Sequence, residues 1–203
     1  MRARKKKNLI PRLERCADYI VEKVTAPESG LLWLEIGCGK GRFATGMAEL
    51  YPENTFYALE KVPNVMVMAV EKAAAKELKN VKFIIGDAEK LEEICPPQSV
   101  DTLFLNFSDP WPRNRTAKLR LTYRTFLERY KKILKPGGTI AFKTDNKPLF
   151  DFSVEEFKEC GFETYDYTED LHNSGIENPV VTEYEQRFSD LGQPIYHVKA
   201  RLL

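Results

Sequence analysis

The chain has 203 residues, of which 43% are hydrophobic and 30% are charged, a composition that excludes a disordered or collagen-like protein. This length predicts one domain, with a core large enough to need no disulfide or metal. No segment approaches the ~18 uninterrupted apolar residues of a membrane helix, and no apolar segment of a signal peptide follows the basic start. We therefore expect a cytoplasmic protein.

The formal net charge of +1 is an average over segregated segments. Residues 113–135 contain nine basic residues and one acid, whereas residues 151–170 contain eight acids and one lysine. Residues 2–7 add five basic residues. Opposed blocks of this kind predict an electropositive face for a polyanion, with the acidic stretch away from it. A solvated helix face is the alternative for any single run.

Strand-length apolar runs alternate with helical patterns along the chain. The predicted strands are residues 31–36, 55–59, 81–85, 100–107, 139–143, 162–167 and 195–201, and the predicted helices are residues 42–51, 62–78 and 116–134. The alternation predicts a mostly parallel sheet covered by helices on both faces. The last two strands have no predicted helix between them, which indicates an antiparallel pair at one edge. Residues 168–194 are polar and turn-rich, and we expect them to cover an active site.

The cysteines are too widely spaced for a zinc or redox motif, so we expect reduced, structural thiols. They are Cys16, Cys38, Cys95 and Cys160. Only two histidines accompany them, and the spacing of the carboxylates does not indicate a metal site either. The sequence therefore predicts no metal cofactor.

A glycine-rich turn, residues 37–41, follows the first predicted strand and its acid Glu35. Glycines let a backbone turn tightly and approach a ligand closely. The dinucleotide pattern G-x-G-x-x-G needs a glycine at position 42, where Arg42 stands, so this turn does not fit that cofactor. An acid at the strand end would also repel a pyrophosphate, which favours a cationic ligand.

Two more acids, Glu60 and Asp87, end the next two predicted strands. Ligands of open parallel sheets bind outside the carboxyl ends of the strands, where these acids should converge with Glu35. Glu60 lies about 20 residues after the glycines, the distance from which a carboxylate accepts ribose hydroxyls. The pattern predicts a ribose-bearing, phosphate-free, cationic cofactor, and S-adenosylmethionine fits. For Asp87 alone, a helix N-cap is the alternative.

The fourth predicted strand runs into Asp109-Pro110-Trp111-Pro112, a loop that two prolines make rigid beside the expected methyl donor. Trp111 either closes the end of the sheet or stacks on a base. Basic residues crowd the segment after this loop without acids at helical spacing, which favours phosphate binding over salt bridges within the helix. They are Arg113, Arg115, Lys118, Arg120 and Arg124.

Five segments together resemble the tRNA (guanine-N7)-methyltransferase family, in family order and over residues 30–203. They are the E-I-G-x-G-x-G turn, the acid after the second strand, the D-P-W-P loop with its basic residues, residues 142–146 (FKTDN) and residues 182–188 (TEYEQRF). The D-P-W-P loop and the T-E-Y-E-x-R-F segment are the most specific of them. The resemblance implies an α/β, single-domain, Rossmann-like class I methyltransferase fold with a seven-stranded sheet. It also implies S-adenosylmethionine as cofactor and tRNA as partner.

The resemblance implies roles for individual residues as well. S-adenosylmethionine would be held by Glu35, Gly37, Gly39, Gly41, Glu60, Asp87 and Asp109, with Asp109 also the catalytic residue. The target nucleotide, by resemblance guanosine 46 of the variable loop, would be held by Arg113, Asp145, Thr182, Glu183, Tyr184 and Glu185. The tRNA would contact Arg115, Thr116, Ala117, Lys118, Leu119 and Arg120.

The chain departs from the family pattern at three positions. The family commonly has lysine, histidine and arginine where this chain has Arg113, Thr116 and Leu119. Only the positive charge at Arg113 is kept. The other two departures leave no histidine in this loop and change the set of RNA contacts that the resemblance implies.

Guanine N7 already carries a lone pair, so its methylation requires no general base. The site has to align N7 with the methyl group and the sulfur, and to stabilise the positive charge that passes to the purine. Asp109 and Asp145, after adjacent predicted strands, are placed for this task. Thr182 and Glu185 could read the Watson–Crick edge of guanine; turn chemistry is their alternative role.

Two other functions compete at this stage: a methyltransferase for a small metabolite, and a non-catalytic RNA-binding module. The basic residues after the D-P-W-P loop argue against a small neutral substrate, and the intact cofactor acids and glycines argue against lost catalysis. No protein partner is indicated, and the sequence is compatible with a monomer or a homodimer. We expect residues 1–8 to be a disordered basic arm that adds phosphate contacts, and residues 9–203 to be the single domain.

Overall fold

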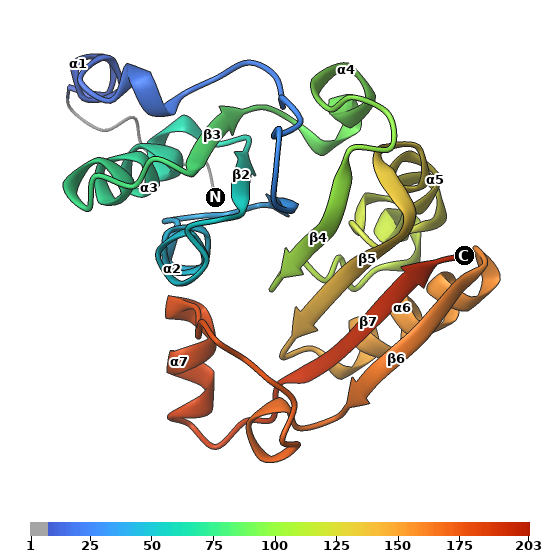
Figure 1. Cartoon of the computed structure of the whole chain (residues 1–203). Coiled ribbons are helices and arrows are strands. Elements are labelled where there is room, and N and C mark those ends of the chain that lie inside the picture. The colour runs from blue at the N-terminus through green and yellow to red at the C-terminus, as the bar shows by residue number, and fades with distance from the viewer. Residues whose placement is uncertain (1–7) are drawn as a thin grey trace.

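A computed structural model describes residues 8–203, so the predicted basic arm lies outside the described residues except for Asn8. The described chain forms one seven-stranded sheet in the order β3-β2-β1-β4-β5-β7-β6, with helices on both faces (Figure 1). None of the helices in this part of the chain combines the length and apolar character needed to cross a membrane.

The elements agree with the predicted alternation. The strands are β1 (Leu32–Ile36), β2 (Thr55–Glu60), β3 (Val81–Ile85), β4 (Val100–Asn106), β5 (Leu134–Thr144), β6 (Phe162–Thr168) and β7 (Tyr196–Leu202). The α-helices are α1 (Leu9–Glu14), α2 (Arg42–Leu50), α3 (Pro63–Ala75), α4 (Leu91–Ile94), α5 (Arg124–Ile133), α6 (Lys147–Glu159) and α7 (Glu183–Ser189). Short 3-10 turns are η1 (Ala17–Tyr19), η2 (Ala88–Lys90), η3 (Asn114–Leu119) and η4 (Leu171–Asn173).

The sheet is parallel from β3 to β5 and antiparallel around β7. The predicted antiparallel pair of β6 and β7 is confirmed, but β7 lies between β5 and β6, so the outermost strand is β6. The carboxyl ends of β1, β2, β4 and β5 therefore meet at one edge of the sheet. The predicted fold class is confirmed.

Two hydrophobic clusters sandwich the sheet, because successive side chains of a strand point to opposite faces. Leu34 of β1 packs in a cluster with Tyr130 of α5 and Phe157 of α6. Ala58 of β2 belongs to the opposite cluster, with Met66 of α3. The two clusters hold the strands from both sides and thereby fix the positions of the loops at their carboxyl ends.

The predicted basic helix over residues 116–134 is wrong as one element. The chain forms the turn η3, then an extended stretch, and enters α5 only at Arg124. Arg120 ends the turn by donating to the carbonyl oxygens of Pro110 (3.0 Å) and Trp111 (3.1 Å). The extended backbone of Tyr123 then serves as the N-cap of α5. The break separates the basic residues of η3 from those of α5.

The charge blocks are also less separate than predicted. Arg124 of the basic block pairs with Glu156 (2.6 Å) and Glu159 (2.7 Å) of the acidic block, across the contact between α5 and α6. Lys132 pairs with Glu92 (2.8 Å) and Lys135 with Asp101 (2.8 Å). Salt bridges between elements, which spacing within one helix does not reveal, take up this half of the basic block.

The prediction of no helix between the last two strands is wrong, because the segment between β6 and β7 contains α7. Thr182 is the N-cap of α7: its Oγ1 accepts from the Glu185 backbone N–H (2.9 Å), and the Glu185 carboxylate accepts from the Thr182 backbone N–H (3.2 Å). This capping box satisfies two backbone donors that the first turn of a helix leaves open. The T-x-x-E spacing is the sequence signature of this capping box, which takes up the two side chains predicted to read the base.

All four cysteines are free thiols, as their spacing predicts. Cys16, Cys38 and Cys95 are buried. Burial raises the pKa of Cys95 to about 12, so this thiol stays protonated at neutral pH. It behaves as a small apolar side chain of the core.

Candidate active site

The glycine turn leaves β1 and bends back over the end of β2. Gly37, Gly39 and Gly41 all have positive φ, at 78°, 56° and 75°, a region that other residues enter only with strain. The Gly37 N–H donates to the Leu59 carbonyl (2.8 Å), which ties the turn to β2. A Cβ on Gly37 or Gly39 would meet nothing within 4 Å, so the turn borders open space where a ligand can approach the backbone.

Gly41 has a different role, because it packs against α3. A Cβ added there would lie 2.4 Å from the Cβ of Ala69. Replacing Gly41 by alanine should lower the free energy of unfolding by about 2–4 kcal/mol, from the left-handed backbone and the overpacked contact together. Urea unfolding measures this change. Gly37→Ala is the matched control: it has the same kind of backbone but no clash, so its free energy of unfolding should fall by only about 1 kcal/mol. Equal losses in the two variants would contradict the packing argument.

Glu35 lies on β1 beneath the glycine turn and is only 2% exposed. Its Oε1 accepts from the side-chain amide of Asn106 at the end of β4 (2.9 Å), whereas its Oε2 is buried and has no partner among the described residues. Burial raises the pKa of Glu35 to about 7, against the opposing effects of the Asn106 hydrogen bond and the charge of Lys143. A buried acceptor without a donor is costly, and a cationic N–H donor would relieve that cost.

Glu60 lies beside the turn, and Glu60 and Asp87 each already have a local partner. The Glu60 carboxylate accepts from the backbone N–H of Gly39 (3.1 Å) and of Val62 (2.9 Å), so it holds the glycine turn in place. Each carboxylate oxygen has further lone pairs, which leaves Glu60 able to accept from ribose hydroxyls. Asp87 caps η2 through the Glu89 N–H (3.1 Å), which is the alternative role that the sequence allowed.

The loop after β4 holds Asp109 in the open. Phe107 and Trp111, on either side of it, have left-handed backbones with φ of 53° and 40°. Two such residues cost of order 1–2 kcal/mol each, a strain that clusters at functional sites. The Asp109 carboxylate is exposed and makes no hydrogen bond or ion pair within residues 8–203. The fold therefore presents an unpaired carboxylate at the edge of the sheet, next to the ends of β1 and β5.

An aromatic wall stands beside this carboxylate, formed by Phe107, Tyr184 and Phe188. The ring of Tyr184 lies 5.1 Å from that of Phe107 and 4.5 Å from that of Phe188. Its hydroxyl donates to Asp145, after β5, at 3.4 Å. Tyr184 is 46% exposed, so one side of the wall is free for a planar ligand. The structure thus brings together Asp145 and Tyr184, which lie far apart in the sequence.

Thr182 and Glu185, predicted to read the base, have side chains that are already hydrogen-bonded and are not free to contact a ligand at this wall. Both side chains close the capping box of α7, and Glu185 is fully buried. Its carboxylate also accepts from Lys143 (2.9 Å) and Asn178 (2.6 Å). Direct reading of a guanine edge by Glu185 would require breaking these contacts. The side chain of Glu183 lies outside the described part of the structure.

The predicted RNA contacts fall into two groups. Arg113, Arg115 and Lys118 are exposed, and none of the three has an ion-pair partner among the described residues. Arg120 instead holds the D-P-W-P loop through two carbonyls, and its guanidinium lies 4.3 Å from the centre of the Phe152 ring. Thr116 donates to the Arg113 carbonyl (2.8 Å) within η3. Leu119 is a partly exposed apolar residue and Ala117 a half-buried one.

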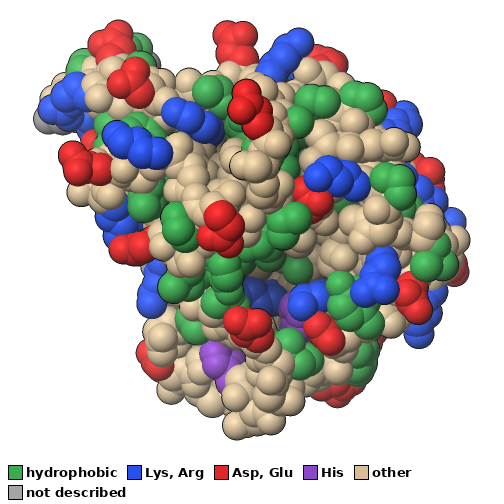
Figure 2. Space-filling model, in the orientation of Figure 1, with side chains coloured by type: hydrophobic (Ala, Val, Ile, Leu, Met, Phe, Trp, Pro, Cys, Tyr) green, Lys and Arg blue, Asp and Glu red, His purple; other side chains and the backbone are tan. Residues whose placement is uncertain are grey.

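Sequence reasoning missed two polar residues of the site, Asn106 and Lys143. They are paired neighbours on β4 and β5, and both line a cavity of about 270 Å³ between the sheet, α2 and residues 171–179. Figure 2 shows this face hollowed, with basic and histidine side chains inside. His197 also lines the cavity with both ring nitrogens unpartnered, and burial lowers its pKa to about 4. A lysine inside a buried apolar strand was the signal that could have identified Lys143.

The residues present fit S-adenosylmethionine on three observations. The unpartnered Oε2 of Glu35 lacks a donor that an ammonium group would supply. The turn at Gly37 and Gly39 leaves room for a ligand against the backbone. Glu60 stands at the end of the neighbouring strand with acceptor capacity for ribose. An anionic dinucleotide would be repelled by the Glu35 and Glu60 carboxylates.

This fold, together with a cofactor site formed by Glu35, Glu60 and the glycine turn, defines an S-adenosylmethionine-dependent methyltransferase. A family model described as "Putative methyltransferase" matches residues 29–198. Among solved structures, the chain is similar to an S-adenosylmethionine-dependent methyltransferase from Aquifex aeolicus, with a TM-score of 0.60 and 16% identity over 97% of this chain and 92% of that one. It is also similar to the 16S rRNA methyltransferase KamB, with a TM-score of 0.64 and 17% identity over 99% and 96%. At these identities, the likeness shows the fold alone.

Sequence relatives define the particular family. The chain is 45% identical to the tRNA (guanine-N(7)-)-methyltransferase of Bacillus subtilis strain 168, over 82% of this chain and 78% of that protein. It is 40% identical to the protein of the same name from Streptococcus mutans UA159, over 99% and 100%. The chain belongs to the tRNA (guanine-N7)-methyltransferase family, as its motifs predict.

Proposed function

We propose that this enzyme transfers the methyl group of S-adenosylmethionine to N7 of a guanosine in tRNA, and that the target is guanosine 46 of the variable loop. The observation that carries the proposal is the juxtaposition of an unpaired Asp109 with a cationic-ligand site at Glu35 and an aromatic wall at Tyr184. The exposed basic residues Arg113, Arg115 and Lys118 border the same edge of the sheet and supply the charge for RNA. Family membership supports the reaction and the substrate class.

S-adenosylmethionine, when bound, supplies an electrophilic methyl group on a sulfonium. Glu35 holds the cofactor's cationic end by charge, Glu60 accepts from its ribose hydroxyls, and Asp87 borders the remaining edge of the pocket. The glycine turn lets the cofactor lie against the backbone. These groups bind and orient the donor, and no protein group has to remove a proton from it.

The acceptor side works by orientation and charge. Tyr184 and Phe107 stack on the guanine plane, and Asp145, which accepts from the Tyr184 hydroxyl, lies along its edge. Arg113 holds the phosphate of the target nucleotide. Methylation places positive charge on the purine ring, and the exposed Asp109 carboxylate, unpartnered within the described residues, would stabilise it. N7 needs no general base, so Asp109 does not have to take a proton from the substrate.

Two tRNA transcripts that differ only at position 46, guanosine in one and adenosine in the other, test the target. With labelled S-adenosylmethionine, the guanosine transcript should accept label at least about tenfold faster, because the adenosine transcript has no guanine at position 46 for the pocket to bind. Equal labelling of both would overturn the assignment to position 46. Label in a mixture of small metabolites, but in neither tRNA, would favour the metabolite alternative.

Replacing Arg115 and Lys118 together by alanine should weaken tRNA binding and make it less dependent on salt. Each phosphate contact contributes about 0.7–0.9 to the slope of log affinity against log salt, so the slope should fall by about 1–2. Fluorescence titrations at several salt concentrations measure it. Lys132→Ala is the matched control, because Lys132 is paired with Glu92; a similar change in that variant would contradict a specific RNA role for the η3 residues.

We further propose that the enzyme acts in the cytoplasm on tRNA without an obligate protein partner, as a monomer or a homodimer. The contribution of the basic arm to tRNA binding is part of this proposal. Removing residues 1–8 should weaken tRNA affinity and leave cofactor affinity unchanged.

A further inference from the structure

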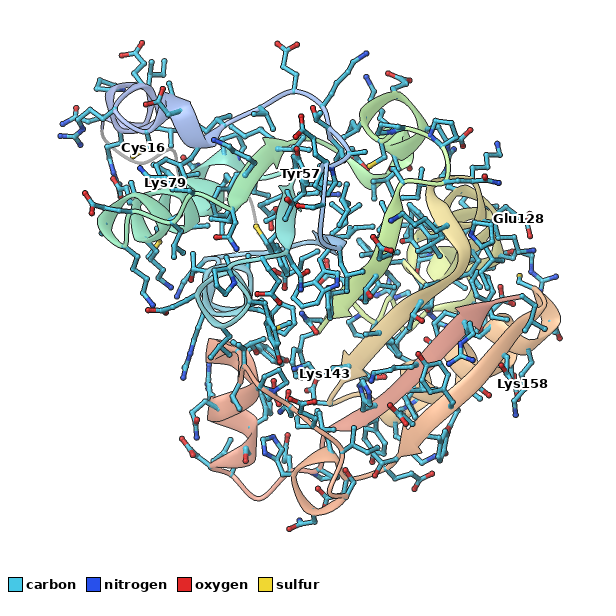
Figure 3. All side chains as sticks on the ribbon, viewed as in Figure 1. Cys16, Tyr57, Lys79, Glu128, Lys143 and Lys158 are labelled. Carbon is cyan, nitrogen blue, oxygen red and sulfur yellow. The ribbon has the colours of Figure 1, made fainter. Side chains whose placement is uncertain are left out.

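A buried ion pair joins the sheet to the segment that covers the active site. Lys143, the next-to-last residue of β5, places its Nζ 2.9 Å from Oε2 of Glu185 on α7. The two side chains are 6% and 0% exposed. Figure 3 shows Lys143 at the end of β5, between the sheet and α7. Neither charge can be balanced by water at this depth, so each depends on the other and on nearby polar groups.

The Glu185 carboxylate contacts several parts of the segment that covers the active site. Its Oε2 also accepts from the Thr182 backbone N–H (3.2 Å), and its Oε1 accepts from Asn178 (2.6 Å) and lies 3.2 Å from Nε2 of His172. Lys143 adds a bond to the Asn178 side-chain oxygen (3.0 Å). One carboxylate and one ammonium therefore connect β5, η4, the chain before α7 and α7 itself.

Helix α7 depends on such an anchor. It has only seven residues, and a helix of this length is unstable without tertiary contacts. It carries Tyr184, whose ring forms the aromatic wall and whose hydroxyl donates to Asp145. Tyr184 and Glu185 are adjacent, so the buried carboxylate sets the position of the ring that faces the substrate.

Lys143 also faces the cofactor side. Asn106, its neighbour across the β4–β5 pairing, donates to Glu35, and the Glu35 charge acts on Lys143. Burial lowers the pKa of Lys143, whereas the charges of Glu185 and Glu35 raise it. The Nζ also lies 5.1 Å from the centre of the Phe43 ring, a favourable contact for a cation.

We propose that Lys143 is a positioning residue. Its ion pair with Glu185 fixes α7 and thereby places the aromatic wall over the pocket. Glu185 thus acts on the substrate by holding α7 rather than by reading guanine. The pair is thus the anchor of the substrate side of the site. This inference deepens the proposed function and rests on it for the substrate's identity.

Four variants test the proposal: Lys143→Met, Glu185→Gln, the double variant, and Lys199→Met as matched control. Lys199 lies on the neighbouring strand and also pairs with an acid, Asp166 (2.8 Å), but it is 35% exposed. Hydrogen exchange of residues 171–189 reports on the covering segment without any substrate. The KM for tRNA and the kcat at saturating tRNA report on catalysis.

Lys143→Met leaves a buried carboxylate unpaired, so exchange of residues 171–189 should accelerate by about tenfold or more, while β1–β4 exchange as in the wild type. The KM for tRNA should rise by about tenfold, with kcat changed less than ~3-fold. The double variant replaces the ion pair by two neutral side chains and should recover most of the loss seen in Lys143→Met. Lys199→Met should change neither measurement.

The proposal is overturned if exchange of residues 171–189 is the same in Lys143→Met and the wild type. It is also overturned if Glu185→Gln abolishes turnover and the double variant is no better, because that pattern indicates direct contact with guanine. If Lys143→Met does not fold, Glu185→Gln and the double variant carry the test: both should fold and keep kcat within ~3-fold of the wild type. Failure of the proposed function looks different, since the wild type itself would then not methylate tRNA while the exchange result would still stand.

Discussion

Replacing Glu35 by glutamine should weaken S-adenosylmethionine binding by about 10- to 100-fold, the loss of one charge-assisted hydrogen bond. The same change should stabilise the cofactor-free protein. Glu35 is buried with an unpartnered Oε2, and glutamine removes the charge while its carbonyl still accepts from Asn106. Calorimetric titration measures the affinity and thermal unfolding the stability. Glu155→Gln, on the exposed side of α6 and without an ion-pair partner among the described residues, is the control and should change neither quantity.

The pH dependence of Glu35 follows from the direction of its pKa shift. Burial raises the pKa of Glu35 to about 7 in the folded protein, so the folded state holds this proton more tightly than the unfolded state. Protonation therefore stabilises the fold below about pH 4.5, and this contribution, roughly 3 kcal/mol, is lost as pH rises to about 7. Cofactor affinity should show the opposite trend and increase as pH rises through about 7, because only the ionised carboxylate attracts the cation.

Both pH dependences should disappear in Glu35→Gln. Above pH 7 the variant should unfold at a higher temperature than the wild type, by an amount that corresponds to about 1–3 kcal/mol. Two results would contradict this role of Glu35: a variant that binds the cofactor normally, or one that is less stable than the wild type above pH 7. Either would mean that the buried, ionised carboxylate does not both destabilise the cofactor-free fold and bind the cofactor's cationic group.

Replacing Asp109 by asparagine should lower the single-turnover rate of methylation by about 100-fold, with tRNA and cofactor both saturating. Asparagine keeps the shape of the side chain and removes the charge that stabilises the purine cation. Because Asp109 is exposed and has no partner within the described residues, the fold should be unaffected. Rapid-quench measurement of label transfer gives the rate.

Asp151→Asn, on the exposed face of α6, provides the control for Asp109 and should react at the wild-type rate. An unchanged rate in Asp109→Asn, with both substrates bound, would remove Asp109 from the reaction. A lower rate that excess cofactor restores would mean that Asp109 only binds the cofactor.

The sheet and the cofactor side could be predicted because their determinants are local in the sequence. Each strand is a short apolar run, and the glycine turn, Glu60 and Asp87 follow directly after strands. Once the strands are parallel and adjacent, their carboxyl ends must meet. The order of β6 and β7 could not be predicted in the same way, because it depends on how the last strand inserts beside β5.

The substrate side was predicted less well, because its contacts are long-range. Thr182 and Glu185 have the spacing of a capping box, but the partner that buries Glu185 is Lys143, 42 residues earlier in the chain. Arg120 and Arg124 look like phosphate ligands in sequence, yet one holds carbonyls of the preceding loop and the other pairs with acids of α6. Spacing within a segment does not show which charges another element will neutralise.

Methyl transfer to guanine N7 in tRNA, at the edge of this sheet, can be tested directly on the reaction product. The most direct measurement incubates the wild type and Asp109→Asn with methyl-labelled S-adenosylmethionine and unmodified tRNA, then digests the tRNA to nucleosides and separates them. We expect label in 7-methylguanosine with the wild type and about 100-fold less in the same time with the variant. Label in any other nucleoside, or none in tRNA with the wild type, would contradict it.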